Sequence, residues 1–567
     1  MANFPVSPGV NTNEIDNTFL TPQPVKVGAA IIGPTVKGPV EIPLVVKSYS
    51  DYKNRFGGAF ISGSDTYSYL TSIAAYNYFN NGGESLLVTR VVTGSYTAAT
   101  SSLISNYLDA TSSSFSFETL SEGVIMNSAG TLNSDGSLTN GTSDNLRWEI
   151  TNSSTGSGTF NVVVRAGNDK TNDKTILESF NGVNLDPNST KYISKVIGDQ
   201  IVSYNVTENQ IDITSGSYPN RSRYIRVKSV TASTPNYFDN SGVAVNAYTS
   251  SLPINGSGSF GSATGDIANG ANFYENISTQ TQGLTVGNYT NMVNLLSNSN
   301  DYQFNILLTP GLIDSLHPST VSSIVTNTQQ RGDNLYVVDM VDYNGTLASA
   351  VTQAQTRNSS YAATYWPWLQ IQDPENGKQV WVPASTMVGG VYAFNDKVAN
   401  TWSAPAGISR GGLSTVIRAK SKLSEANKAE LYSNNINPIN TFPKKGVVVY
   451  GQKTLQKEAS ALDRINVRRL LIELKSYIGQ LADNIVFESN TITTRNNFLT
   501  KVNPYLEAIQ QKNGLYAFRV IMDDSNNTPD VIDRNQLVGQ IYIQPTRTAE
   551  FINLDFILLP TGAEFPS

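Results

Sequence analysis

The last quarter of the chain opens with Gly446-Val447-Val448-Val449-Tyr450-Gly451, a short apolar run closed by a glycine. Such a run predicts a buried strand. A longer pattern follows, in which apolar residues recur at spacings of three and four and therefore share one face of a helix. These residues are Val467, Leu471, Leu474, Ile478, Leu481 and Ile485. The opposite face is charged, so we predict an amphipathic helix packed on a core.

The rest of this quarter predicts a second helix and three strands. The helix covers about 498–511 and contains Pro504, so we expect it to kink or begin anew there. Asn513-Gly514 ends it. The strands are expected at 516–522, 537–544 and 550–558. The last strand has one apolar face, typical of a half-buried strand, formed by Ile552, Leu554, Phe556 and Leu558.

Four short motifs in this quarter resemble a known family. They are Tyr450-Gly451-Gln452-Lys453-Thr454-Leu455, Asn466-Val467-Arg468-Arg469-Leu470, Val486-Phe487-Glu488-Ser489-Asn490 and Ala549-Glu550-Phe551-Ile552. Their order and spacing are similar to those of the C-terminal domain of contractile phage tail sheath proteins. Tyr450 stands where that family usually has tryptophan, and Ser489 where it usually has proline.

The composition restricts the classes of function. The 567 residues include Lys+Arg 39 and Asp+Glu 45, a formal net charge of −6 that argues against phosphate binding as the main activity. Cysteine is absent, which excludes disulfides and thiolate metal sites. We see no secretion leader and no run of about 18 apolar residues, so we expect no membrane insertion.

The first 94 residues continue the resemblance. Residues 6–16 predict an extended segment that by itself would be a frayed terminus, but Pro-Gly-Val followed by Glu14-Ile15-Asp16 resembles the N-terminal arm of sheath proteins. Residues 29–33 predict a buried strand. The turn after it lacks the Gly-Lys-Ser/Thr ending of a phosphate loop. A helix at 67–79 and a strand at 85–91 follow.

Composition changes after Gly94. Residues 95–283 are dense in Ser, Thr, Asn and Gly, with short strand patterns between them, which predicts a β-rich inserted region facing solvent. We expect its outer portions, about 95–145 and 229–280, to tolerate deletion. The segment 177–187 is an exception, because it resembles a recurrent sheath segment.

An α/β pattern returns at residue 286. A strand at 304–310, a helix at 318–330 and a strand at 335–339 predict a parallel strand–helix–strand unit. Ser360 to Trp368 then resembles the Tyr-Ala-Ala-x-Tyr-x-Pro-Trp motif of sheath proteins. The resemblance covers most of the chain outside 95–170 and 207–283.

We therefore expect a multidomain α+β and α/β protein. The expected parts are an N-terminal arm (1–24), the first part of the core (25–94), the β-rich insert (95–283), a central α/β domain (284–440), a C-terminal α+β domain (441–558) and a tail (559–567). The resemblance implies a subtilisin-like fold for the central domain.

A subtilisin-like fold raises the alternative of a degenerate hydrolase. A Ser-His-Asp triad needs a histidine, and the chain has one, His317, directly before Pro318 at the start of a predicted helix. Asp314 and Asp339 lie near it in sequence or strand order, but no Gly-x-Ser-x-Gly motif is present. We expect His317 to begin a helix without a catalytic role, and we expect no catalytic, cofactor or metal site.

Other patterns have simple structural interpretations. Arg331-Gly332-Asp333 spells an adhesive tripeptide, which leaves a β-rich adhesin as a second alternative, but a turn is needed there in any case. The acidic residues at 523–533 lack cation-loop spacing. A cluster of aromatic residues predicts a packed core or a domain seam rather than a carbohydrate platform. It comprises Trp366, Trp368, Trp381, Trp402, Tyr361, Tyr365 and Tyr392.

Two groups of residues are candidates for contacts between proteins. The extended termini could join neighbouring subunits as donated strands, although the last strand could also complete its own domain. The arm residues are Val6, Val10, Ile15, Ile552, Leu554, Phe556 and Leu558. The charged face of the predicted helix is either ordinary solvated surface or, as the resemblance implies, a contact with a tail tube. Its residues are Arg464, Arg468, Arg469 and Lys475.

The resemblance implies a structural subunit without a cofactor. Such subunits form stacked hexameric rings around a tube in the virion, with tail tube, baseplate and tail terminator proteins as partners and no direct nucleic-acid contact. Assembly would take place in the host cytoplasm, and contraction would drive the tube through the bacterial envelope. A tailocin sheath is the close alternative.

Overall fold

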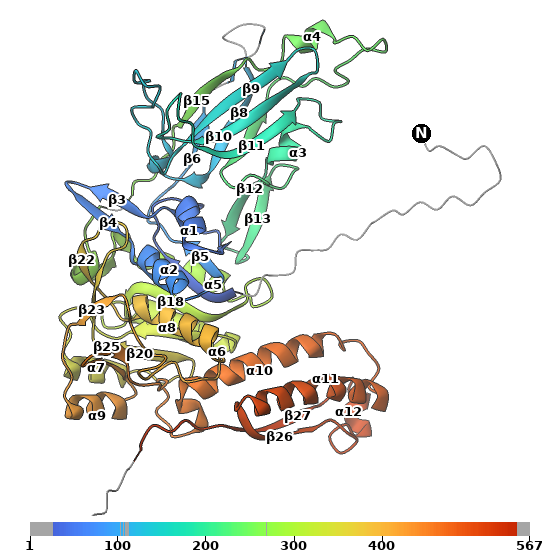
Figure 1. The fold of residues 1–567 in the computed structure, drawn as a ribbon. Coiled ribbons are helices and arrows are strands. Elements are labelled where there is room, and N and C mark those ends of the chain that lie inside the picture. Colours follow the sequence, from blue (N-terminus) through green and yellow to red (C-terminus); the bar gives the residue numbers. More distant parts are fainter. Residues whose placement is uncertain (1–26, 103, 106, 108–112, 268, 553–567) are drawn as a thin grey trace, which may run out of the picture.

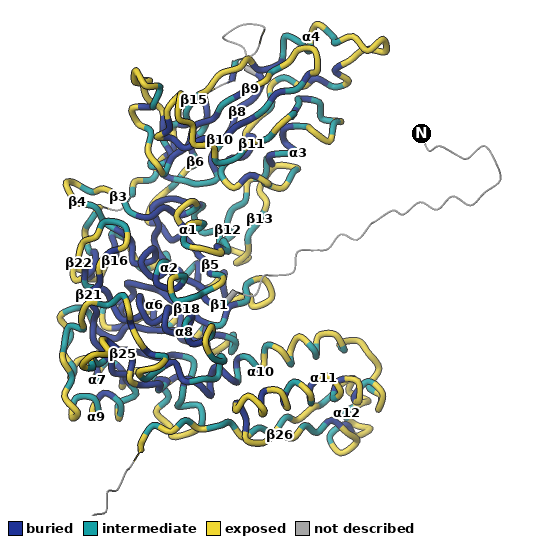
Figure 2. Tube along the Cα trace, in the orientation of Figure 1, coloured by how far each residue is buried: buried dark blue, intermediate teal, exposed yellow. Residues whose placement is uncertain are grey.

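The computed structural model describes residues 27–102, 104–105, 107, 113–267 and 269–552. Figure 1 shows a β-rich region at one end, an α/β core in the middle and a helical region that projects from the other end. Buried segments are concentrated in the core and along the strands of the β-rich region (Figure 2). The expected mixture of helices and strands is confirmed.

One sheet organises the core, with strand order β2-β5-β1-β18-β19-β20-β24-β25. The strands from β5 to β24 are parallel, while β2 and β25 are antiparallel edges. Their bounds are β1 Val27–Gly33, β2 Leu44–Val46, β5 Leu86–Arg90, β18 Phe304–Ile313, β19 Leu335–Asp339, β20 Ala362–Trp366, β24 Asn437–Phe442 and β25 Gly446–Val449. Every residue of β5, β19 and β20 is buried, as in parallel sheets covered on both faces.

Helices cover both faces of this sheet (Figure 1). On one face lie α1 Tyr49–Phe56, α2 Leu70–Asn80 and α8 Ser385–Val398; on the other lie α5 Asn288–Leu295, α6 Pro318–Arg331, α7 Leu347–Ala354 and α9 Glu425–Ser433. Successive side chains of a strand point to opposite faces, so Ala29 and Ile31 join the first apolar cluster while Ala30 and Ile32 join the second.

Short sheets border the core. They are β3 Ala59–Ser62 with β4 Asp65–Ser68, β16 Gln280–Thr281 with β17 Leu284–Thr285, and β21 Leu369–Gln372 between β22 Gln379–Val382 and β23 Val416–Ala419; η2 covers Tyr274–Asn276. The helix expected at 67–79 begins only at Leu70, because residues 65–68 pair with β3 instead. The expected domain boundary at 440/441 falls inside β24, which pairs with β20 and β25. Both strands of that hairpin therefore belong to the core.

The β-rich insert forms one antiparallel sheet in the order β11-β10-β9-β15-β6-β8-β14, with β7 paired to β8. The bounds are β6 Ala98–Ser101, β7 Ile104–Ser105, β8 Ser113–Glu122, β9 Leu146–Ser154, β10 Thr159–Ala166, β11 Ile176–Val183, β14 Ile225–Val230 and β15 Gly256–Gly261, with η1 Val124–Met126, α3 Ile193–Ile197 and α4 Asn246–Thr249. The sheet has its own apolar cluster.

The two ends of the insert are interleaved in this sheet. β15, from the end of the insert, lies between β9 and β6, and β8, from its start, lies between β6 and β14. Removing 95–145 or 229–280 alone would take strands out of the middle of the sheet. The expectation that these portions are separately dispensable is therefore wrong.

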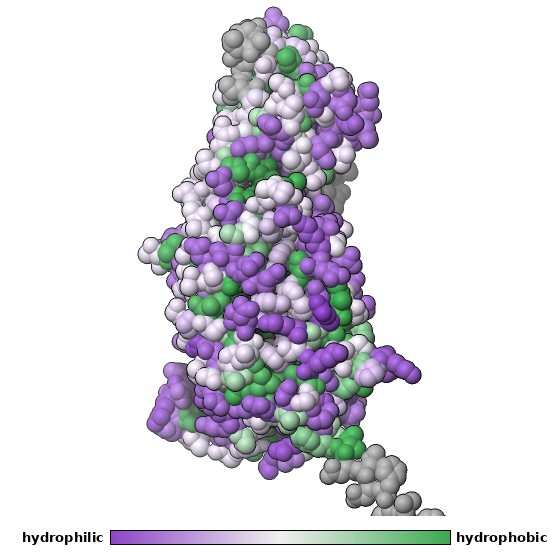
Figure 3. Space-filling view, turned by 90° about the vertical axis from the view of Figure 1, so that its left-hand side faces the viewer, coloured by the Kyte–Doolittle hydropathy of each residue, from purple (hydrophilic) through white to green (hydrophobic). Residues whose placement is uncertain are grey.

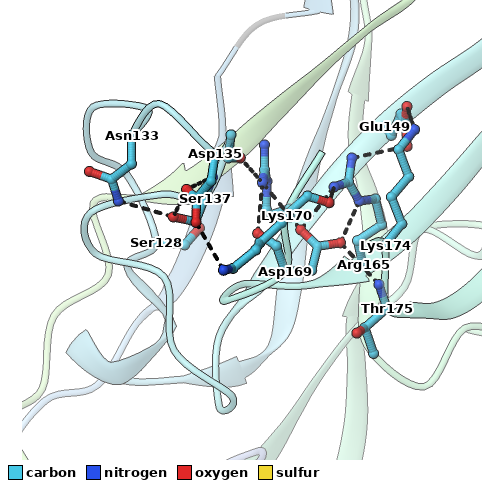
Figure 4. A network of polar contacts seen from close by, with 12 residues as sticks. Ser128, Asn133, Asp135, Ser137, Glu149, Arg165, Asp169, Lys170, Lys174 and Thr175 are labelled. Carbon is cyan, nitrogen blue, oxygen red and sulfur yellow. Dashed lines mark hydrogen bonds and ion pairs between the residues drawn. The ribbon is translucent and has the colours of Figure 1, made fainter. Parts of the chain in front are cut away.

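A buried ion-pair network lies inside the insert (Figure 4). Asp169, whose side chain is 0% exposed, accepts from Arg165 Nε at 2.6 Å and from Arg147 Nη1 at 3.2 Å. Arg165 also reaches Glu149 at 3.1 Å, and Lys174 reaches the same carboxylate at 2.7 Å. Figure 4 shows Glu149, Arg165, Asp169 and Lys174 converging from neighbouring strands and the loop after β10.

Two buried cations of the core hold the insert. Lys37 Nζ donates to the Asp144 carbonyl at 3.1 Å and lies 3.4 Å from its carboxylate. Arg90 Nη1 donates to the carbonyl oxygens of Gly38 at 2.5 Å and Glu122 at 2.9 Å. Burial of the Lys37 and Arg90 side chains lowers the pKa of each, against the pull of nearby acidic groups.

A hairpin of the insert adds a third attachment. It consists of β12 Ile201–Asn205 and β13 Gln210–Ser215 and reaches down to α5 in Figure 1. The Tyr204 hydroxyl donates to the Asn291 carbonyl at 3.2 Å. Tyr204 and Ile211 pack on the second apolar cluster of the core.

The C-terminal region pairs two helices with a two-stranded sheet. Its elements are η3 Ala461–Asp463, α10 Ile465–Asp483, α11 Ile492–Gln511, β26 Leu515–Ile521, α12 Pro529–Asp533 and β27 Gln540–Pro545. α11 is one helix that continues through Pro504 rather than beginning anew there. Thr491 caps its N-terminus. Val502 before the proline and Leu506 and Ile509 after it are all buried, so both halves pack on the same core.

Candidate assembly surfaces

Arg469 of α10 points into the core. It is 3% exposed, and its Nη1 and Nη2 donate to the two carboxylate oxygens of Asp396 at 2.8 and 2.6 Å. Its guanidinium also lies 5.0 Å from the ring centroid of Tyr392. A bidentate Arg–carboxylate pair is geometrically specific, so this contact fixes α10 against α8.

The neighbouring basic residues differ in exposure. Arg468 is 4% exposed and stacks on Tyr361 at 3.9 Å. Lys475 is exposed, with Nζ 3.4 Å from the Tyr361 hydroxyl. Arg464 is partly exposed and pairs with Asp463 at 2.9 Å.

The solvated basic face expected on α10 is therefore wrong for Arg468 and Arg469. Helical periodicity correctly places them away from Leu470 and Leu474, which pack on α11. However, the first half of α10 lies between two cores, and Ile472 on its far side packs on the central one. A helix buried on both sides has no free polar face there.

Glu550 joins the end of the described chain to the core. Its Oε1 accepts from Arg464 Nε at 2.8 Å and Gln452 Nε2 at 3.0 Å, and Oε2 accepts from the Tyr432 hydroxyl. Burial alone would raise the pKa of Glu550, but the hydrogen bonds from Tyr432, Arg464 and Gln452 outweigh it and lower that pKa. The position from which the C-terminal arm leaves is thus fixed.

The strand expected at 550–558 is only partly covered by the structure. Residues 550–552 are not in a strand, and Phe551 and Ile552 are 80% and 74% exposed. The half-buried position expected for Ile552 is therefore wrong within this chain, because no strand of its own domain covers it. The other arm residues lie outside the described residues: Val6, Val10, Ile15, Leu554, Phe556 and Leu558.

The β26–β27 sheet has two strands and, within the described residues, no third strand on either outer edge. One face packs on α11 through Phe518, Ile541 and Ile543. The other face exposes Tyr516 and Tyr542 at 63% and 55%. Unpaired strand edges can accept an added strand.

His317 is used at the start of α6, as expected. Its side chain is buried; Nδ1 accepts from the Ile313 N–H at 3.0 Å, and Nε2 lies 2.8 Å from the Ser278 carbonyl oxygen. Nε2 therefore carries the proton and donates it. Burial lowers the pKa of His317. Both ring nitrogens are occupied by backbone groups.

The two aspartates considered for a triad have other partners. Asp314 pairs with Arg357 at 2.6 Å. Asp339, at the end of β19, accepts from the Ser385 N–H at 3.0 Å and the Ser385 hydroxyl at 2.5 Å. Burial raises the pKa of Asp339 to about 6, against the hydrogen bonds from Ser385. Asp339 thus caps the first turn of α8.

The Arg331-Gly332-Asp333 tripeptide is folded on itself. Arg331, with a side chain 2% exposed, donates to both carboxylate oxygens of Asp333 at 2.9 and 2.8 Å and to the Tyr302 carbonyl at 2.8 Å. Gly332 has φ +70° and ends α6. A buried, self-paired arginine cannot serve a receptor, so the adhesive alternative has no support here.

The aromatic cluster is core and seam, as expected. Trp366 and Trp368 are buried in the two clusters of the core. Trp402 packs against the C-terminal cluster, and its Nε1 donates to the Lys512 carbonyl at 3.3 Å.

Among the residues that the structure describes, no three His, Cys, Asp or Glu side chains are grouped so as to hold a metal ion. Within the same residues no helix combines the length and apolar character needed to cross a bilayer. Apolar surface is divided into small separate patches on the face shown in Figure 3.

Asp396 was missed by the sequence analysis. No local pattern reveals it, because its partner is 73 positions away. Glu550 was noted only as part of a motif, and its role depends on contacts across 86 to 118 positions.

The fold and contacts define a mixed α/β protein whose C-terminal region is fixed to an α/β core. Residues 283–455 match the phage tail sheath protein central domain, and residues 457–558 match the phage tail sheath C-terminal domain. These matches relate residues 283–558, just under half of the chain, to phage tail sheath proteins.

Two curated relatives are tail sheath proteins. That of Vibrio phage KVP40 is 39% identical over 220 residues, 39% of this chain and 33% of the relative. That of Enterobacteria phage T4 is 38% identical over 229 residues, 40% of this chain and 35% of the relative. The matched part thus spans about a third of each relative.

A solved structure is similar over nearly the whole chain. The contracted helical sheath of the anti-feeding prophage has 16% identity and a TM-score of 0.49, covering 98% of this chain and 99% of that one.

Proposed function

We propose that this chain is the structural subunit of a contractile tail sheath. It would polymerise as stacked hexameric rings around a tail tube and contract to drive the tube through the bacterial envelope during genome delivery. The observation that carries this proposal is the match of 283–558 to both sheath domains, together with the tail sheath relatives.

The proposed partners are further copies of the chain, the tail tube protein, and baseplate and tail terminator proteins. Assembly in the host cytoplasm, without direct nucleic-acid contact or membrane insertion, is part of the same proposal. Arg464 and Lys475 remain candidates for the tube contact because both are accessible. Arg468 and Arg469 are not, because they are buried within the chain.

The proposed domains follow the sheets. Residues 25–94 and 284–455 form the subtilisin-like core, 95–283 the insert, and 457–558 the C-terminal domain, with an arm at 1–24 and a tail at 559–567. The doubly covered parallel sheet supports the core assignment. No catalytic role or cofactor is proposed, since His317 is held by backbone groups on both ring nitrogens.

The terminal arms are proposed to link neighbouring subunits as added strands. Glu550 fixes where the C-terminal arm begins, Ile552 is exposed beyond it, and the β26–β27 sheet offers unpaired edges. Backbone hydrogen bonds each contribute only about 1 kcal/mol net, but repeated strands make such links cooperative.

Electron microscopy of the purified chain tests the proposal. Rings or striated tubes are expected. Truncation before Pro545, or removal of residues 1–16, should give folded monomers that do not assemble. If the full chain shows neither rings nor tubes at any concentration, the proposal is wrong; if the C-terminal truncation unfolds its domain, the last strand is intrinsic.

A further inference from the structure

Three apolar side chains are exposed in the loop between α10 and α11 and at the start of α11. Val486, Phe487 and Ile492 are 57%, 104% and 61% exposed. We call residues 484–491 the tip loop. Its apolar side chains contrast with those of the rest of the helix pair, which face a shared core.

The tip loop is held in a defined shape. Phe487 has φ +71°, a left-handed conformation that bulky residues rarely adopt. Asn490 Nδ2 donates to the Gln536 carbonyl at 2.9 Å, and the Glu488 N–H donates to the Ile485 carbonyl at 3.1 Å. The backbone therefore keeps the Phe487 ring in solvent, and a side chain ordered in advance loses less entropy on binding.

A hollow of about 410 Å³ lies on the core, between the end of α8, the segment 407–416 and the start of β25. We call it the socket. Its lining is mixed, because four polar side chains, Lys445 among them, lie beside the apolar ones of Phe394, Ile408, Leu413, Val416 and Val447. Leu413 and Val447 are buried at its floor, and Ile408 is half exposed at its rim. Because an apolar cavity of about 150 Å³ holds benzene, the socket has room for an aromatic ring.

The charges beside the two features are complementary. Glu488 follows Phe487 directly and is exposed, and Lys445 is exposed at the socket. Within the described residues neither side chain has an ion-pair partner. If the ring of Phe487 enters the socket, the carboxylate of Glu488 comes close to the ammonium group of Lys445.

The tip loop does not reach the socket of its own chain. Arg469 binds Asp396 near the end of α8, close to the socket residue Phe394. From Arg469, α10 continues to Asp483, roughly 20 Å farther along its axis at about 1.5 Å per residue. The tip loop lies beyond that end.

We infer that the tip loop of one subunit inserts Phe487 into the socket of a second copy, with Glu488 facing Lys445. Tip and socket are different surfaces, so a contact that is not returned by the same partner leaves a free tip and a free socket at the two ends, and further copies can add to form rings or helices. This inference rests on the proposed function, because it requires the chain to assemble with itself.

Variants of the full chain test this contact. Phe487→Ala should raise the concentration at half assembly, followed by sedimentation, about tenfold or more. Ile61→Ala, which shortens an apolar side chain 77% exposed on another hairpin, should leave assembly unchanged. Glu488→Lys and Lys445→Glu should each weaken assembly severalfold, and the double variant should return to within about twofold of wild type.

Cross-linking tests the same contact directly, because the chain has no cysteine. Phe487→Cys together with Ile408→Cys should give a ladder of covalent oligomers on oxidation. Either single variant should give dimers at most.

The opposing outcomes are distinct. Wild-type assembly by Phe487→Ala, or a charge-swapped double variant no better than the singles, overturns the contact while leaving the proposed function intact. Normal rings that fail to hold tube protein would assign the tip loop to the tube and also overturn it. A wild-type chain that never assembles overturns the proposed function and the inference with it.

Discussion

The insert and the C-terminal region use buried charge in opposite ways. In the insert, Arg147 and Arg165 are neutralised by Asp169, in the loop after β10. In the C-terminal region, Arg469 is neutralised by Asp396 of the core. These two buried arginines of the insert therefore find their shared carboxylate within the insert, whereas Arg469 of the C-terminal region depends on the neighbouring core.

This difference predicts how each region responds to disruption. Breaking a buried ion pair by removing one partner typically costs about 3–5 kcal/mol, because a charge is left uncompensated. Such damage in the insert should stay local to its sheet. The same damage at Arg469 should loosen α10 from the core.

Deletions within the insert give the largest expected effect. Removing 98–145 takes out β6, β7 and β8 and should unfold the insert completely. Excising 98–263 as a unit should leave a folded core, because Thr97 N–H donates to the Thr264 carbonyl at 3.0 Å and a short turn can join them. Proteolysis and circular dichroism distinguish the two; equal damage from both would show that the insert is not a separate unit.

Asp169→Asn should be the most damaging single substitution in the insert. It leaves Arg147 and Arg165 buried without their shared carboxylate, and we expect a loss of about 3–5 kcal/mol in the unfolding free energy. Denaturant melts measure it. Asp135→Asn, at an exposed pair with Lys170, is the matched control and should leave the unfolding free energy nearly unchanged.

Arg469→Met should lower the unfolding free energy somewhat less than Asp169→Asn does, by about 2–4 kcal/mol. The methionine side chain fills part of the space that the arginine leaves, and Asp396 is partly exposed to solvent. Lys475→Met, on the same helix but exposed, should be close to neutral. Hydrogen exchange should show the loss in α10 and α8. If the Arg469→Met variant instead lost its protection from hydrogen exchange first in the insert, the difference drawn between the two regions would be wrong.

The smallest effect is a pH dependence in the core. The pKa of Asp339 is about 6 in the folded chain against 3.8 for the ordinary group, so the folded state binds the proton more tightly. Its contribution to stability is present below about pH 4 and is lost as the pH rises through 6. Asp339→Asn mimics the protonated form and should gain on wild type by on the order of 2 kcal/mol between pH 4 and 7.

His317 works in the opposite direction. Its lowered pKa costs stability as the pH falls through the ordinary value of 6.5. The wild type and the Asp339→Asn variant both carry His317. Its contribution to the pH dependence therefore cancels when the stability of one is subtracted from that of the other. A difference that stays constant with pH would show that Asp339 is ionised at all these values.

Local patterns predicted the core well. β5, β19 and α6 lie within a residue or so of their expected bounds, because continuous apolar runs and a proline at the first helical turn are signals carried by adjacent residues. The resemblance in the last quarter likewise rests on short contiguous motifs.

The remaining features depend on long-range pairing. β15 (Gly256–Gly261) has Phe260 as its buried residue among glycines and serines, so no periodicity reveals that it lies in the middle of a sheet. The burial of Arg468 and Arg469 follows from a second core beside α10, which a single-helix pattern does not contain. Exposure of Phe487 is equally invisible, since an aromatic residue in sequence usually predicts burial.

The three attachments of the insert have a mechanical consequence. The insert is held by Lys37, by Arg90, which also binds the carbonyl of the adjacent Gly38, and at another place by the β12–β13 hairpin, so a swivel of the insert on the core would break these contacts. Torque applied to the core is therefore transmitted to the far end of the insert near α4. The linear displacement there grows with its distance from the axis of rotation, so a small turn of the core becomes a wide sweep at its periphery.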